Sequence, residues 1–215
     1  MRESAMAVQI TNMDEFQQRF CELKDHADLF AYFLFDSRMS HEKVGAFANK
    51  QFDWLNSLAI AADMFLFVFI QPDRSNRGFA INPSAEVAQM FGISPNQLPG
   101  VVLFTLSEDK ENVSHGVFLP INAKLFEEEV DRVEKIFADL ITVIQKCRRK
   151  GHATPEGLME EIGAEIPRLR REDAMRPIWN YFKENLAGIL NLPKEILTAT
   201  TTAIAESIAR KAVGG

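Results

Sequence analysis

The stretch at residues 85–106, AEVAQMFGISPNQLPGVVLFTL, decides which fold the sequence predicts. Residues 85–91 have the apolar spacing of a short helix, and Gly92 is well placed to end it. An irregular turn with two prolines follows, and residues 100–107 form an apolar run of strand type. We therefore expect a helix, a proline-containing turn and a strand, in that order.

Two fully apolar runs precede this stretch, LFAYFLFD at 29–36 and MFLFVFIQ at 64–71. Apolar runs without alternation are typical of strands that are buried on both faces. A helical stripe lies between the two runs, and right-handed crossover connections predict that such strands are parallel neighbours. A helix over 12–24, which Thr11 or Asn12 can cap, comes before them.

A polar connection and a second apolar run, GVFLPI at 116–121, follow the opening stretch. We predict that this run is a strand antiparallel to 100–107, and Pro120, which has no amide hydrogen for a strand ladder, indicates an edge position. A long amphipathic helix over 125–149 comes next. Its basic end is interpreted as favourable helix-end charge rather than as a phosphate- or acid-binding patch. These basic residues are Lys146, Arg148, Arg149 and Lys150.

The order of these elements resembles that of the thioredoxin-like fold. MFGISPNQLPGVVLF, at 90–104, is similar to the thioredoxin stretch in which a short helix ends at Tyr/Phe-Gly-Ile and a loop carries a cis proline. The resemblance covers about residues 12–149. It implies a cis Leu98–Pro99 bond, with Phe104 near the position of the strand's aromatic residue. The predicted fold class is α/β, with a thioredoxin-like central mixed sheet flanked by helices.

The segment that corresponds to the reactive Cys-x-x-Cys of thioredoxins contains no cysteine. It reads FDSRMSH at 35–41, so dithiol–disulfide exchange is chemically impossible at that position. Ser37, Ser40 and His41 are too close in sequence to favour a nucleophile–base pair, and a serine here is better explained as a helix cap. We predict no catalytic residue.

The remaining cysteines and histidines show no cofactor or metal motif. Cys21 and Cys147 are far apart, the four histidines are dispersed, and there is no glycine-rich phosphate loop. We therefore expect no metal and no cofactor. Cys147 lies in the apolar stripe of the long helix and is expected to be a buried thiol. Cys21 is the residue that a single-cysteine redox enzyme would use.

Composition predicts a soluble protein with an aromatic core. The 17 phenylalanines cluster in the first two-thirds of the chain, and the net charge of −6 disfavours nucleic acid as a partner. No uncharged apolar run is long enough to span a bilayer, and the first residues do not resemble a secretory signal. These features predict a cytoplasmic protein with no integral membrane segment.

The sequence predicts two parts, a thioredoxin-like domain at 1–150 and a helical C-terminal extension at 151–215. The first helix of the extension begins near Pro155, and we expect Pro167 to break it. Two further helices are predicted at 176–191 and 193–213. The last one has a narrow apolar stripe and is the favoured interaction element, with membrane-surface contact as a weaker reading.

These features favour a non-catalytic interaction or scaffold module over an enzyme. In thioredoxin relatives the cis-proline loop receives an extended peptide, and such binding can persist without the thiols. The chain would then bind another protein, or a second copy of itself, through this edge or through its C-terminal helices. The alternative is a single-cysteine redox enzyme or another unrecognised enzyme. The binding positions that the resemblance implies are Ser37, Arg38, Met39, Ser40, Leu98 and Pro99.

Overall fold

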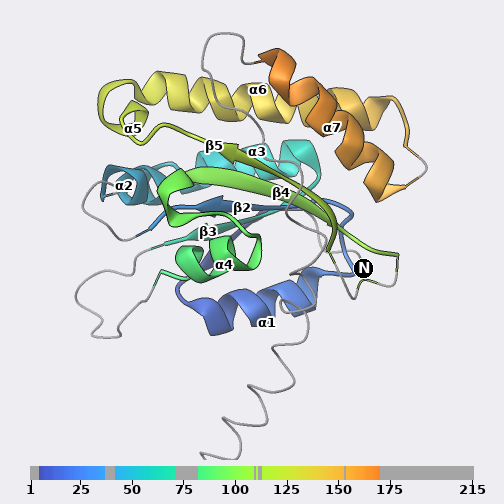
Figure 1. Cartoon of the computed structure of the whole chain (residues 1–215), viewed down its shortest axis with the longest axis horizontal. Coiled ribbons are helices and arrows are strands. Elements are labelled where there is room, and N and C mark those ends of the chain that lie inside the picture. The colour runs from blue at the N-terminus through green and yellow to red at the C-terminus, as the bar shows by residue number, and fades with distance from the viewer. Residues whose placement is uncertain are drawn as a thin grey trace, which may run out of the picture.

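A five-stranded mixed sheet forms the centre of the protein in a computed structural model (Figure 1). The structure describes residues 5–36, 42–70, 82–108, 110, 113–152 and 154–169. The strands are β1 (Ala7–Ile10), β2 (Phe30–Leu34), β3 (Phe65–Phe69), β4 (Gly100–Leu106) and β5 (Val113–Pro120). They lie in the order β1-β3-β2-β4-β5, with β3 parallel to β1 and β2, and β4 antiparallel to β2 and β5.

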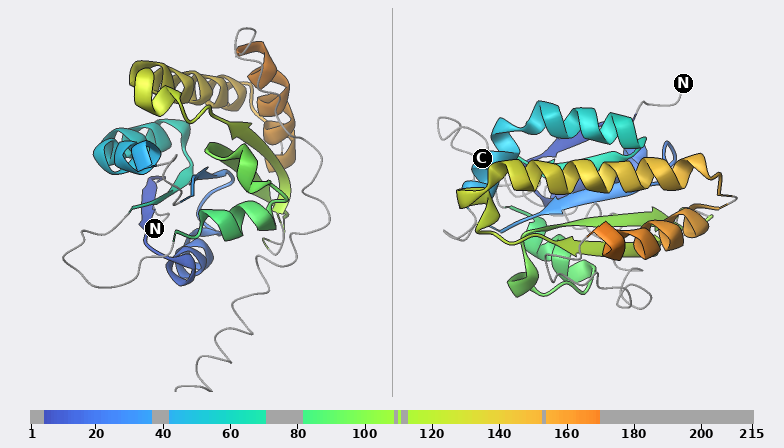
Figure 2. Two further views of the ribbon diagram at one scale, coloured as in Figure 1. Left: turned by 60° about the vertical axis from the view of Figure 1, so that its left-hand side comes forward. Right: turned by 90° about the horizontal axis from the view of Figure 1, so that it is seen from above.

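Helices cover both faces of this sheet (Figures 1 and 2). One face carries α1 (Met13–Leu23) and α4 (Ser84–Met90). The other carries α2 (Glu42–Lys50), α3 (Phe52–Ala62), α6 (Val130–Arg149) and α7 (Pro155–Leu169). The short elements are the 3-10 turn η2 (Pro95–Gln97) and α5 (Leu125–Glu128). Because both faces are covered, every residue of β2, β3 and β4 is buried.

Several predicted features are confirmed. β2 and β3 are parallel neighbours, β5 is an antiparallel edge strand, and the Leu98–Pro99 bond is cis. Asn12 caps α1, since its side-chain oxygen accepts a hydrogen bond from the Glu15 N–H at 2.9 Å. The opening stretch therefore has the predicted helix, turn and strand.

Four details differ from the sequence prediction. The edge strand β1 was not predicted, and its first residue is held by the Asn56 side chain of α3, which accepts the Ala7 N–H at 2.8 Å. The predicted crossover helix is two helices, α2 and α3. The long helix is also interrupted, because the backbone of Glu129 is non-helical between α5 and α6. The break expected at Pro167 is wrong, since α7 continues to Leu169; a proline this late in a helix removes few of its hydrogen bonds.

Aromatic side chains fill both layers between the sheet and its helices, as the phenylalanine content predicted. Under α1, the Phe16 ring lies 5.1 Å from the ring of Tyr32 on β2. On the opposite face, the Phe33 ring lies 5.3 Å from the ring of Phe137 on α6. Successive residues of β2 thus point into different layers. The central strand connects the two halves of the core.

α7 is the part of the predicted C-terminal extension that the structure describes. It lies against α6 and over β4 and β5 (Figure 2). Its buried apolar face consists of Leu158, Met159, Ile162 and Ile166. The helices predicted at 176–191 and 193–213 lie outside the described residues. Among the described helices, none has the length and apolar character needed to cross a membrane.

The basic end of α6 is largely engaged within the chain. Lys146 Nζ lies 2.9 Å from Glu165 Oε2, and Lys150 pairs with Glu161, both on α7. Arg148 instead donates to the Asp63 carbonyl oxygen at 2.6 Å, at the end of α3. Three of the four cations in this cluster therefore attach α6 to neighbouring helices.

Acidic pH is expected to loosen α7. Hydrogen bonds from Ser114 and Lys150 lower the pKa of Glu156 and of Glu161, respectively, below the ordinary value of 4.5. A lowered pKa in the folded state stabilises docking above pH 4.5, and this contribution is lost as the pH falls through the lowered values. His152 Nε2 also lies 2.6 Å from Glu161 Oε2, so Glu161 contacts two residues at the end of α6.

Hydrogen exchange of the α7 amides, corrected for the intrinsic exchange rate at each pH, measures this effect. Protection of α7 should fall below pH 4.5 before protection of α6 does. In a Glu161→Gln variant the fall should be shallower, because one of the two titrating carboxylates is gone. Unchanged α7 protection across this pH range in the wild-type chain would contradict the prediction.

Candidate functional site

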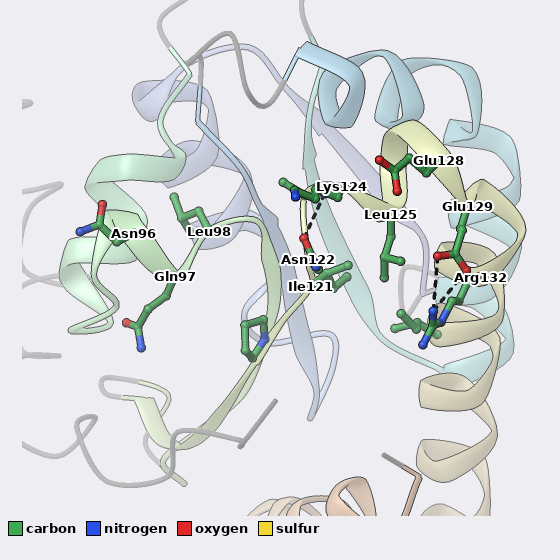
Figure 3. A pocket seen from close by; sticks show the side chains of 13 residues that line it. Asn96, Gln97, Leu98, Ile121, Asn122, Lys124, Leu125, Glu128, Glu129 and Arg132 are labelled. Atoms are coloured by element: carbon green, nitrogen blue, oxygen red, sulfur yellow. Dashed lines mark hydrogen bonds and ion pairs between the residues drawn. The ribbon is translucent and has the colours of Figure 1, made fainter. Parts of the chain in front are cut away.

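An open groove of about 770 Å³ lies beside the cis-proline turn (Figure 3). One wall is formed by η2 and Leu98, and the other by α5 and the start of α6. Ile121, directly after β5, lies between the two walls. The groove therefore forms where the ends of several elements converge, which is a common position for a ligand site.

Hydrogen bonds hold the proline turn in place. The Gln97 side-chain oxygen accepts the Ser94 N–H at 2.8 Å, and the Leu98 N–H donates to the Pro95 carbonyl at 3.3 Å. The Pro99 carbonyl then accepts the Ile121 N–H at 2.8 Å, which ties the turn to the end of β5. The turn, which forms the left wall in Figure 3, is therefore bonded directly to Ile121, which lies between the two walls.

The apolar lining of the groove includes three buried residues and two that are more accessible. Leu98, Ile121 and Leu125 are buried, whereas Pro120 and Ile136 are half-buried. All five line the groove. The groove thus offers limited apolar surface, suited to a single side chain of a ligand rather than to a large hydrophobic face.

Two of the charged residues that line the groove are engaged with each other. Arg132 Nη1 lies 3.2 Å from Glu129 Oε2. Lys124 and Glu128 also line the groove, and neither side chain has an ion-pair or hydrogen-bond partner in the described part of the chain. These two residues are therefore the charges most available to a ligand.

The predicted binding positions are only partly brought together. Leu98 lines the groove, while Pro99 is buried and does not line it. Ser37, Arg38, Met39 and Ser40 lie outside the described residues. The backbone just before this segment is held at Phe35. The Asn82 side chain donates to the Phe35 carbonyl at 2.7 Å and accepts the Ser84 N–H at 2.9 Å.

Sequence reasoning missed the whole wall opposite Leu98. This wall includes Lys124, just before the predicted helix at 125–149, and Leu125 and Glu128, which the sequence placed at the start of that helix. The polar pair Asn122 and Lys124, between an edge strand and a helix, was the available signal, but such residues are also typical of an ordinary connecting turn.

The cysteines do not belong to the groove. Cys147 is buried, as predicted, and burial raises its pKa. Cys21 is exposed on α1, but partial desolvation raises the pKa of its thiol, against the opposing effect of Lys24. A raised pKa lowers the thiolate fraction at neutral pH, and the thiolate is the reactive form.

No cluster of three His, Cys, Asp or Glu side chains that could hold a metal ion occurs in the described ranges. Comparison of the chain with protein-family models, with curated proteins and with solved structures finds no match.

Proposed function

We propose that the chain is a non-catalytic, thioredoxin-like interaction module that holds a segment of a partner protein in the groove beside Leu98. Support for the thioredoxin-like assignment comes from the strand order, the antiparallel β4 and β5, the helices on both faces and the cis Leu98–Pro99 bond. The antiparallel pair, the flanking helices and the cis bond agree with what the sequence analysis predicted, whereas the position of β1 in the strand order adds to it.

The observation that carries the proposal is the open groove itself. It combines a small apolar floor with side chains that can hydrogen bond to a ligand, and it lies next to the turn that receives extended peptide in the family that the chain resembles. A protein segment suits this arrangement because its backbone and side chains offer both polar and apolar groups. The binding role predicted for the last helices concerns residues beyond those described.

The alternative of a single-cysteine enzyme gains no support from the surroundings of Cys21. Catalytic cysteines are usually activated by a lowered pKa, whereas the pKa of this thiol is raised by desolvation. Cys21 is also absent from the lining of the groove. We therefore base the functional proposal on binding alone.

The test is affinity capture from the native cell with the full chain and two tryptophan variants. Asn96→Trp places a large ring at the exposed rim of the groove, and Glu160→Trp places the same ring on the exposed side of α7 as a matched control. A protein retained by the wild type and by Glu160→Trp should be lost with Asn96→Trp.

Each captured protein is then purified and its affinity measured by calorimetry. Blocking the groove should weaken binding by about ten-fold or more, equivalent to about 1.4 kcal/mol. Equal affinities for the wild type and Asn96→Trp would refute a groove-mediated interaction.

A further inference from the structure

Two of the three amide side chains that line the groove, Gln97 and Asn122, already accept a hydrogen bond from the chain's own backbone. The Gln97 oxygen accepts the Ser94 N–H at 2.8 Å, and the Asn122 oxygen accepts the Lys124 N–H at 3.1 Å. Each amide therefore keeps mainly its NH2 group for a ligand, and an NH2 group can only donate. A ligand that lies between these residues must present oxygen acceptors.

This donor character favours an extended segment over a helix. Backbone carbonyl groups of an extended segment are free to accept hydrogen bonds, whereas most of those in a helix are bonded to the helix's own N–H groups. In Figure 3, Gln97 and Asn122 lie on opposite sides of the space beside Leu98. They are therefore placed to contact different parts of one segment that crosses the groove.

The charges of Lys124 and Glu128 favour different groups on a ligand. Lys124 lies between Leu98 and Leu125 in Figure 3, whereas Glu128 lies above Leu125. Lys124 adds a positively charged donor to the neighbouring amide donors, so the part of the groove between Leu98 and Leu125 is complementary to a carboxylate. Glu128 is the only lining carboxylate in the described chain without an ion-pair partner, and it would instead attract a basic group.

We infer that the groove selects an extended peptide segment in which an acidic side chain lies next to an apolar one. Lys124 binds the acid, the amides of Gln97 and Asn122 bind backbone carbonyls, and the apolar side chain packs against Pro120 and Ile136. This inference rests on the proposed function, because it names the chemistry of the partner segment that the same groove holds.

The test uses an array of short random peptides, acetylated and amidated so that any carboxylate comes from a side chain. Sequences that bind the full-length wild-type chain should be enriched in Asp or Glu next to an apolar residue. The best sequence is then titrated in three matched forms, in which the acidic position is Asp, Asn or Lys.

Two variants that each remove one charge show which residue causes the selectivity for an acidic peptide. Lys124→Gln should weaken the Asp peptide by about five-fold, the scale of one exposed ion pair, and leave the Asn peptide unchanged. Glu128→Gln should leave the Asp peptide equal or tighter, because it removes a nearby negative charge. Both side chains are exposed and have no hydrogen-bond or ion-pair partner in the described part of the chain, so the two variants should fold like the wild type. Higher salt should reduce the preference for Asp over Asn.

Three outcomes would overturn the inference. The first is preference for the Lys peptide that disappears in Glu128→Gln, and the second is equal binding of all three peptides with no effect of Lys124→Gln. The third is no enriched sequence at all. The second outcome leaves the proposed function intact if Asn96→Trp still abolishes peptide binding. Loss of the proposed function itself is shown separately, by full-length partners that bind Asn96→Trp as well as the wild type.

Discussion

Replacing Phe33 with alanine is expected to lower the free energy of unfolding by about 4 kcal/mol. The Phe33 side chain is fully buried on β2 and lies between the sheet and three helices. Truncation removes its contacts and leaves a cavity that these packed rings can fill only in part. The rings around it belong to Phe35, Phe47, Phe126 and Phe137, with centroids 5.3 to 6.4 Å away.

Urea denaturation followed by far-ultraviolet circular dichroism measures this loss. Phe33→Leu is the matched control, because it keeps an apolar side chain of intermediate size and should cost clearly less. If both variants lost the same stability, the size of the cavity would not be the cause. The melting temperature of Phe33→Ala should fall by about 10 °C for a chain of this size.

The same substitution should also weaken ligand binding. Phe33 stacks on Phe126 of α5, at 6.0 Å between ring centroids, and Phe126 is followed closely by the residues that form the right wall of the groove in Figure 3. Looser packing under α5 therefore reduces the preorganisation of that wall. The affinity for the peptide should fall even at temperatures where the variant is folded.

Gly100→Ala is expected to destabilise the protein by about 3 kcal/mol. A Cβ atom at Gly100 would lie 2.5 Å from the Phe118 ring and 2.6 Å from the Leu119 carbonyl oxygen. The second contact is with backbone, so it cannot be relieved by a rotamer change alone. β4 and β5 must separate locally, at the point where the proline turn enters the sheet.

Gly45→Ala provides the matched control for this prediction. Its Cβ would meet only Phe35 Cε2, at an ordinary 3.5 Å, within the helix α2. Alanine is the better helix former, so this variant should gain about 0.5 to 1 kcal/mol. Chemical denaturation of the two variants side by side should give opposite signs. Similar stabilities for both would contradict the close approach of β4 and β5.

The central strands, the proline turn and the aromatic core could be predicted because each has a signal in the local sequence, and the crossover rule then paired β2 with β3. Residues 29–35 and 64–70 are apolar throughout, and the stretch around Leu98 carries a recognisable order of elements. β1 could not be predicted in this way. It has only four residues, and its position depends on β3 and on the Asn56 side chain, which are both distant in sequence.

The candidate groove was harder to predict than the fold. Leu98 was identified from the resemblance, but the opposite wall depends on the interruption at Glu129, which separates α5 from α6. The donor character of the groove depends on which atom of Gln97 is already bonded to Ser94. Neither the composition of the chain nor the spacing of its residues shows which atom is bonded, because this hydrogen bond forms only when the turn has closed.

The side-chain cap on β1 has a consequence for self-association of the protein. The carbonyls of Met6 and Ile10 accept hydrogen bonds from β3, so the alternate residues Ala7 and Gln9 direct their backbone groups away from it. Because Asn56 already accepts the Ala7 N–H, an incoming strand would find the Gln9 N–H as the only outward backbone donor along the described strand β1. This short, blocked edge protects the sheet from aggregation by strand addition.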